Sequence, residues 1–118
     1  SAVRDFVYSE DVADAMVKII QKKIQIPLNI GSGKGTSIKN LVKNMLKSKF
    51  ILEKPKVYFD KTKPSGDKKR VLDMTLAKKY GISCKTKLDT GLEKTIEWYL
   101  RFSKKTTSKK YNYFTDKS

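Results

Sequence analysis

A glycine-rich segment is the first place in this sequence where chemistry would be expected. Gly31, Gly33 and Gly35 follow an apolar stretch and precede a helical pattern, which is where proteins build phosphate-binding loops. A Walker loop requires Gly-Lys followed by Ser or Thr, whereas here Gly35 follows Lys34. A dinucleotide loop of the form G-x-G-x-x-G would place its third glycine one residue later. We therefore interpret these glycines as a tight turn between two elements.

Two other groups have residue types found in catalytic sites but lack the setting that catalysis requires. Tyr113 and Lys117 have the Tyr-x-x-x-Lys spacing of a proton-transferring pair, but they lie in a polar tail without a helical pattern, so we assign the spacing to chance. Cys84 is the only cysteine and the chain contains no histidine to activate it, so we expect a buried apolar side chain. No internal disulfide, His-based triad or zinc site is predicted, which fits a reducing, cytoplasmic compartment.

Lysine dominates the charge of the chain. Lys and Arg total 27 against 12 Asp and Glu, so the formal net charge is +15. Such an excess raises nucleic acid or an anionic membrane as a partner. Only Arg4, Arg70 and Arg101 are arginines, however, and no apolar run reaches the roughly 20 residues of a membrane span. We interpret the lysines as a solvated surface and expect neither nucleic acid nor membrane as the partner.

The elements that must position these residues alternate between strand and helix patterns. The predicted strands cover residues 3–8, 24–30, 57–59 and 70–72. The predicted helices cover residues 9–21, 38–46, a short segment that Gly81 ends, and a last segment from about residue 90 to 100. We expect Ser9 to cap the first helix and Thr36 or Ser37 to cap the second, on which Lys39, Lys43 and Lys47 form a solvated face.

Two longer segments are more informative about function. Residues 4–15 and 59–73 resemble, in order and spacing, segments of the extended short-chain dehydrogenase/reductase family, and they are most similar to its GDP-L-fucose synthases. Those enzymes carry R-[DE]-F-x-[HY]-V-D-D-[LV]-A-D-A and F-D-x-[ST]-K-P-D-G-x-x-[RK]-[RK]-x-L-D at these places. Residues 28–38 and 90–100 resemble the family's glycine turn and final helix. The resemblance covers about residues 3–101 and depends on the collinearity of these motifs.

The resemblance implies that basic residues bind the diphosphate of a nucleoside-diphosphate sugar. Arg4 and Arg70 stand where the family has two basic residues, and an arginine there would donate two parallel hydrogen bonds to phosphate oxygens. Lys56 matches a further substrate-contacting position. Lys63 and Asp67 are expected to shape the loop over the sugar nucleotide. These five residues are the predicted substrate-binding set.

Two alternatives for the arginines follow from the residues alone. Arg4 could instead form a surface ion pair with Asp5 or Asp11, and Arg70 could simply be exposed to solvent. The sequence also departs from the family pattern at Ser9, where valine is usual, and at residues 65–67, where Asp-Gly-Thr is usual. These departures leave GDP, UDP and dTDP sugars open as the substrate.

The resemblance further implies a fold and a context. We expect an α/β chain with a small mixed sheet and about four helices over residues 1–103, and a basic, disordered tail over residues 104–118. The family's NADP-binding loop and its catalytic Tyr and Lys lie upstream of the segment that Arg4 begins, and Ser1 is not preceded by Met. We therefore expect the carboxy-terminal, substrate-binding portion of a cytoplasmic epimerase/reductase that acts on a 4-keto-6-deoxy sugar nucleotide.

In this interpretation the chain itself holds no catalytic, cofactor-binding or metal-binding residue, and NADP is bound by the missing amino-terminal domain. The partners are a GDP-sugar or another nucleoside-diphosphate sugar, and the missing domain. The unpaired edge of the first strand also predicts self-association, for example as a homodimer. Two alternatives stay open: a basic nucleic-acid-binding module, and a non-catalytic remnant that binds sugar nucleotides.

Overall fold

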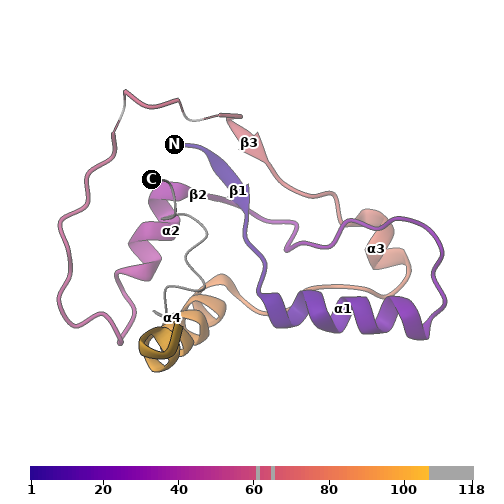
Figure 1. Cartoon of the computed structure of the whole chain (residues 1–118). Helices are drawn as coiled ribbons and strands as arrows, with labels where there is room; N and C mark the ends of the chain where they lie inside the picture. The colour runs from indigo at the N-terminus through magenta and orange to yellow at the C-terminus, as the bar shows by residue number, and fades with distance from the viewer. Residues whose placement is uncertain (61, 65, 107–118) are drawn as a thin grey trace, which may run out of the picture.

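A three-stranded mixed sheet lies at the centre of the molecule (Figure 1). The computed structural model describes residues 1–60, 62–64 and 66–106. The strands are β1 (Val3–Asp5), β2 (Gly35–Ser37) and β3 (Lys69–Arg70), in the order β2-β1-β3. β1 pairs antiparallel with β2 and parallel with β3. Each strand is short, so the sheet brings together three distant parts of the chain through few hydrogen bonds.

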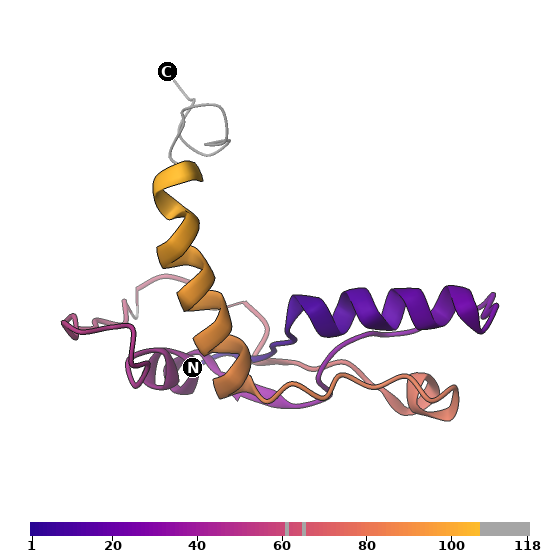
Figure 2. The ribbon, with the colours of Figure 1, turned by 90° about the horizontal axis from the view of Figure 1, so that it is seen from below.

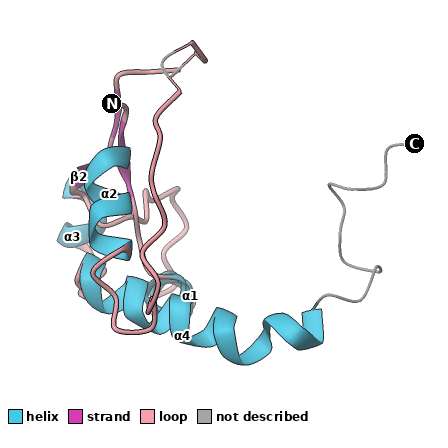
Figure 3. Cartoon of the chain, turned by 90° about the vertical axis from the view of Figure 1, so that its left-hand side faces the viewer, coloured by secondary structure: helices cyan, strands magenta, loops and turns pink. Residues whose placement is uncertain are grey.

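Four helices complete the described chain, which confirms the predicted fold class. They are α1 (Ser9–Gln21), α2 (Ile38–Met45), α3 (Thr75–Lys79) and α4 (Leu88–Thr106). Figure 2 shows α4 leaving the other elements and projecting away from them towards its carboxyl end. Figure 3 shows the long connection between α2 and β3 running mostly as loop. Within the described residues, no helix is long and apolar enough to cross a membrane.

The helix ends agree with most of the predicted caps. The Ser37 hydroxyl accepts a hydrogen bond from the Asn40 amide and caps α2, so of the two predicted candidates Ser37 is the cap and Thr36 is not. Gly81 follows α3 at φ +73°, a conformation that glycine adopts without strain. The prediction for Ser9 was wrong, because Tyr8 is the N-cap of α1 and supplies the first accepting carbonyl, while Ser9 already lies inside the helix.

The strand predictions were less accurate than the helix predictions. The predicted strand over residues 3–8 ends at Asp5, and residues 24–30 and 57–59 form no strand. Ile24, Leu28 and Ile30 pack against the core instead of pairing with a described strand, and Pro27 has no amide N–H to donate to a ladder. Apolar character marked these residues for burial, and packing against helices satisfies burial without a strand.

A small apolar core lies between α1 and α3. Its buried members are Ala15, Met74, Ala77 and Ile82. The opposite side of α1 is open: Met16 is 59% exposed, Val17 52% and Ile20 75%. Apolar side chains on α4 are exposed as well, with Trp98 at 56% and Tyr99 at 60%. The described chain thus leaves two helices with uncovered apolar side chains.

The last helix extends beyond the predicted start of the tail. α4 continues to Thr106, three residues into the segment expected to be tail. Residues 107–118, including the Tyr113 and Lys117 pair, lie outside the described residues.

Candidate functional site

Arg4 and Arg70 lie side by side on neighbouring strands. Their Cα atoms are register partners in the parallel pairing of β1 with β3. Parallel strands in register point paired side chains to the same face of the sheet, so both guanidinium groups leave the same face. Arg4 Nη1 donates hydrogen bonds to the carbonyls of Val3 and Asp67, each at 2.8 Å. The parallel pairing brings together the two arginines that the sequence singled out.

Asp67 connects the two arginines from the loop before β3. Its carbonyl accepts from Arg4, and its carboxylate forms an ion pair with Arg70. Both partners of that ion pair are largely exposed, at 74% for the Arg70 side chain and 59% for Asp67, so the pair adds little stability. Gly66 has φ +64°, and a Cβ atom on it would lie 3.6 Å from Arg4 Nη2. The loop therefore passes directly over the Arg4 guanidinium.

The alternative ion pairs of Arg4 do not form among the described residues. Both carboxylates accept hydrogen bonds elsewhere: Asp5 from the glycine turn, and Asp11 from the amide and hydroxyl of Thr86, each at 2.8 Å. The alternative for Arg70 was simple exposure to solvent. Arg70 is exposed, but it also forms an ion pair with Asp67. Arg4 is thus held by carbonyl oxygens, which do not neutralise its charge.

The Asp5 carboxylate holds the glycine turn together. Its carboxylate accepts from the amides of Ser32 (2.9 Å), Gly33 (3.0 Å) and Leu72 (3.3 Å), and from the Ser32 hydroxyl. Burial by itself would raise the pKa of Asp5, but these hydrogen bonds outweigh it and lower the pKa below the ordinary value. A Cβ atom at Gly31 would come within 2.9 Å of an Asp5 oxygen. The Leu72 side chain is closer still, at 2.7 Å, so a side chain at position 31 would meet both Leu72 and Asp5.

The same geometry excludes the glycine turn as a dinucleotide-binding loop. The amides of Ser32 and Gly33, which would face a pyrophosphate, already donate to Asp5. Strand β2 also lies between the turn and α2, so no helix begins directly after the turn. These residues do not fit NADP, and the anion that the turn binds is a carboxylate of the same chain.

Lys63 lies beside a hollow of about 560 Å³ next to the start of β1. Ala2, Ile38, Phe59 and Asp60 also line it. Lys39, predicted as part of the solvated face of α2, is exposed and borders the same hollow. Of the five predicted substrate-binding residues, four lie around the start of β1 and the loop before β3. The exception is Lys56, which is exposed in the coil after α2 and makes no hydrogen bond or ion pair with a described residue.

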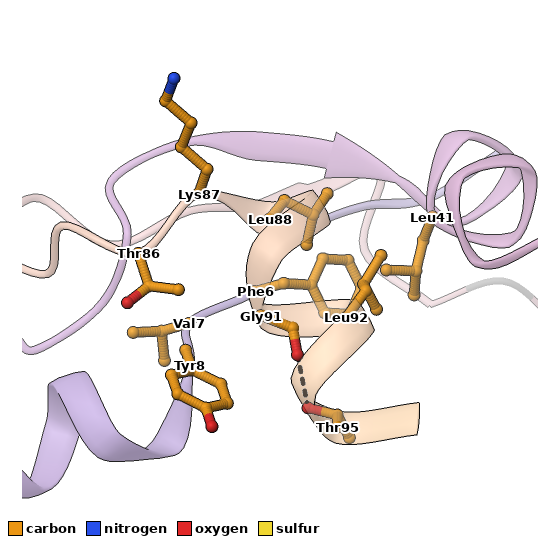
Figure 4. A pocket seen from close by; sticks show the side chains of 10 residues that line it. All are labelled: Phe6, Val7, Tyr8, Leu41, Thr86, Lys87, Leu88, Gly91, Leu92 and Thr95. Carbon is orange, nitrogen blue, oxygen red and sulfur yellow. Dashed lines mark hydrogen bonds between the residues drawn. The ribbon is translucent and has the colours of Figure 1, made fainter. Parts of the chain in front are cut away.

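A second, apolar hollow of about 120 Å³ lies between α4, α2 and the segment after β1 (Figure 4). Phe6, Leu41, Leu88 and Leu92 gather around it, and the Thr95 hydroxyl donates to the Gly91 carbonyl. A hollow this small with an apolar wall is a packing gap between elements. It contributes to the scaffold and not to the candidate site.

The remaining reactive group is Cys84. It is half-buried, and burial together with the nearby carboxylates Asp11 and Asp5 raises the pKa of its thiol, which keeps it protonated at neutral pH. The thiol is therefore not activated, but the predicted full burial was wrong, because Cys84 is only partly buried. The described residues contain no cluster of His, Cys, Asp and Glu that could hold a metal ion.

The structural roles of Asp5, Asp11 and Thr86 were not predicted from the sequence. Asp5 binds the glycine turn and Leu72, and Asp11 binds Thr86 in the segment before α4. The only local signal was the position of Asp5 next to Arg4, because its hydrogen-bond donors are 27 and 67 residues away in the chain. The glycine turn fits no phosphate-binding motif, and Asp5 stands next to a candidate phosphate-binding arginine. Together these two features would have suggested that the Asp5 carboxylate binds the amides of the turn.

Comparison with known proteins gives three relevant similarities. The chain is 32% identical over 99 residues to GDP-L-colitose synthase of Yersinia pseudotuberculosis and 31% over 102 residues to GDP-L-fucose synthase 1 of Arabidopsis thaliana. It is also 32% identical over 100 residues to a trifunctional UDP-glucose 4,6-dehydratase/UDP-4-keto-6-deoxy-D-glucose 3,5-epimerase/UDP-4-keto-L-rhamnose-reductase of A. thaliana. These matches cover 84%, 86% and 84% of this chain. No family model matches the chain.

The matches cover much less of the relatives than of this chain. The chain spans 32% of the length of the colitose synthase, 31% of the fucose synthase and 15% of the trifunctional enzyme. The similarities confirm the resemblance to GDP-L-fucose synthases that the motifs indicated.

Proposed function

We propose that this chain binds the diphosphate of a nucleoside-diphosphate sugar between Arg4 and Arg70. The observation that carries the proposal is the register of β1 with β3, which pairs these two arginines on one face of the sheet. Two adjacent guanidinium groups match the charge and the oxygen geometry of a diphosphate.

The hydrogen bonds already made leave donors available for such a ligand. Arg4 uses Nη1 for two carbonyls, and Arg70 uses Nη2 for Asp67. Within the described residues, Arg4 Nη2 and Arg70 Nη1 donate to no protein group. The carbonyl contacts fix the orientation of Arg4 before a ligand arrives, which reduces the entropy lost on binding. In this proposal the hollow beside Lys63 takes the part of the ligand next to the diphosphate.

The wider role that we infer is that of the carboxy-terminal substrate-binding part of an NAD(P)-dependent epimerase/reductase. The names of the relatives support a sugar nucleotide that is a GDP or a UDP derivative. The chain would hold and orient the 4-keto-6-deoxy sugar nucleotide, and residues outside it would bind NADP and transfer the hydride and protons. Its contribution to rate would come from positioning.

The direct test is calorimetric titration of GDP into the 118-residue chain and into four variants. Arg4→Ala and Arg70→Ala each remove charge-assisted hydrogen bonds, so we expect each to weaken binding by about 10- to 150-fold. Lys43→Ala on the exposed face of α2 is the charge-matched control and should leave affinity unchanged. Lys39→Ala is not a neutral control, because Lys39 borders the hollow. GDP affinity that ignores both arginines would contradict the proposal.

The same variants separate this function from nucleic-acid binding, which the charge of +15 would favour. Binding to a DNA duplex would depend on the total number of lysines and fall steeply with salt. Replacing Lys43 would then weaken binding about as much as replacing Arg4. Salt-sensitive duplex binding with that pattern, and no GDP binding, would support the alternative.

We also propose that the exposed apolar side chains of α1 and α4 are covered by the remainder of a longer protein. Met16, Val17 and Ile20 on α1 are more than half exposed, which is costly for side chains of this size. The isolated chain should therefore self-associate as its concentration rises. Light scattering checks this, and a monomer at millimolar concentration that binds no apolar dye would contradict it. Met16→Lys with Ile20→Lys should reduce the association.

A further inference from the structure

A third hollow, distinct from the arginine pair, lies at the β2 side of the sheet. Its volume is about 250 Å³. The glycine turn, β2 and the segment before α4 form its wall, with Lys34, Lys85 and Lys87 among the lining residues. β2 and β3 flank β1 on opposite sides, so this hollow lies across β1 from Arg70.

The lining of this hollow is positively charged. Among the described residues, no Asp or Glu lines it, and its three lysines form no ion pair. Two carboxylates, Asp11 and Asp5, act on Cys84 in the wall of the hollow, where burial and their charges raise the pKa of its thiol. Both already accept several hydrogen bonds from the protein. The lysines are therefore not neutralised by direct contact with an acid.

Hydrogen-bond donors accompany the charge. The Thr36 hydroxyl lines the hollow and makes no hydrogen bond with a described residue, whereas the Thr86 hydroxyl already donates to Asp11. Figure 4 shows the Lys87 side chain pointing away from the apolar cluster around Phe6, so its ammonium group is not drawn into the core. Three lysines and a hydroxyl group among the residues that line one hollow match the charge of an oxyanion with two negative charges.

We propose that this hollow binds a phosphate group, supplied either as inorganic phosphate or as a small phosphate monoester. The site goes beyond the proposed diphosphate site, because it uses neither Arg4 nor Arg70. A hollow of about 250 Å³ holds a phosphate group with room for a few further atoms, but not a whole nucleotide sugar.

Cys84 makes the test local, because it is the only cysteine in the chain and it lines the hollow. Bound phosphate would obstruct the thiol and, as an added negative charge, raise its pKa further, so alkylation by iodoacetamide should slow. The rate is measured by mass spectrometry at increasing inorganic phosphate, with sodium chloride keeping the ionic strength constant. A parallel series uses glycerol 3-phosphate. We expect saturable protection of Cys84 in at least one series.

The variants decide whether the protection comes from this hollow. Lys34→Ala, Lys85→Ala and Lys87→Ala should each raise the half-protecting concentration about two- to fivefold, the range for one exposed charge contact. Lys43→Ala, on the exposed face of α2, should leave it unchanged. Tighter protection by glycerol 3-phosphate assigns the site to a monoester, and equal protection assigns it to the phosphate group alone.

Three outcomes would overturn the proposal. They are no protection in either series, protection that survives all three lysine substitutions, and protection lost in the control Lys43→Ala. Titration of the same variants with GDP tests the proposed diphosphate site and not this hollow. A chain that fails to bind GDP but shows lysine-dependent protection of Cys84 would refute the diphosphate site and leave this one standing.

Discussion

Two adjacent residues of β1 face opposite sides of the sheet and use their charges in opposite ways. Asp5 accepts hydrogen bonds from Ser32, Gly33 and Leu72, so it is fully engaged in holding distant segments together. Arg4 is oriented by carbonyl groups and keeps donors that no described residue uses. The difference teaches that a charged residue can serve stability or binding according to whether its partners belong to the chain.

The largest expected effect comes from removing the Asp5 carboxylate. Asp5→Ala leaves the amides of Ser32, Gly33 and Leu72 without their acceptor, so we expect a loss of about 2–4 kcal/mol in the free energy of unfolding. Arg4→Ala should cost less than about 1 kcal/mol, because its contacts are few and partly exposed. Urea unfolding followed by circular dichroism measures both. Equal losses would remove the distinction between the two residues.

The pH dependence sharpens the same contrast. The pKa of Asp5 is lowered in the folded chain, so its stabilising contribution is present above the unfolded pKa of about 3.8 and is lost as the pH falls through the folded pKa. Wild type should therefore lose stability below about pH 4 more steeply than Asp5→Asn, which does not titrate. Unfolding measured from neutral pH to pH 3 checks this. Parallel profiles for the two proteins would show that Asp5 contributes nothing as a carboxylate.

The smallest effect is expected at Asp67, whose carboxylate occupies one of the Arg70 donors. Asp67→Asn removes the exposed ion pair with Arg70 but keeps the carbonyl that Arg4 uses. Stability should change by less than about 1 kcal/mol, and GDP affinity should rise about two- to fivefold as Arg70 gains a free donor and the site loses a negative charge. Isothermal titration measures the affinity. Weaker binding by Asp67→Asn would mean that the carboxylate orients Arg70 for the ligand.

Local interactions explain which parts of the fold were predictable from the sequence. The cap by Ser37 and the stop at Gly81 depend on residues within four positions in the chain, and both were predicted correctly. The strand over residues 24–30 was predicted wrongly, because an apolar run indicates burial without specifying a pairing partner. The arginines could be named in advance through the resemblance, but their adjacency could not.

The amino-acid sequence by itself determined the positions of the helices, the cap of α2, the stop after α3 and the basic charge, and it singled out the two arginines. Only the tertiary structure decided that Arg4 lies beside Arg70 and that Asp5 occupies the amides of the glycine turn. The physical reason is the distance along the chain. Helix and cap hydrogen bonds close over a few residues, whereas β1 meets its partners about 30 and 65 residues away, where pairing depends on the folding of the whole chain.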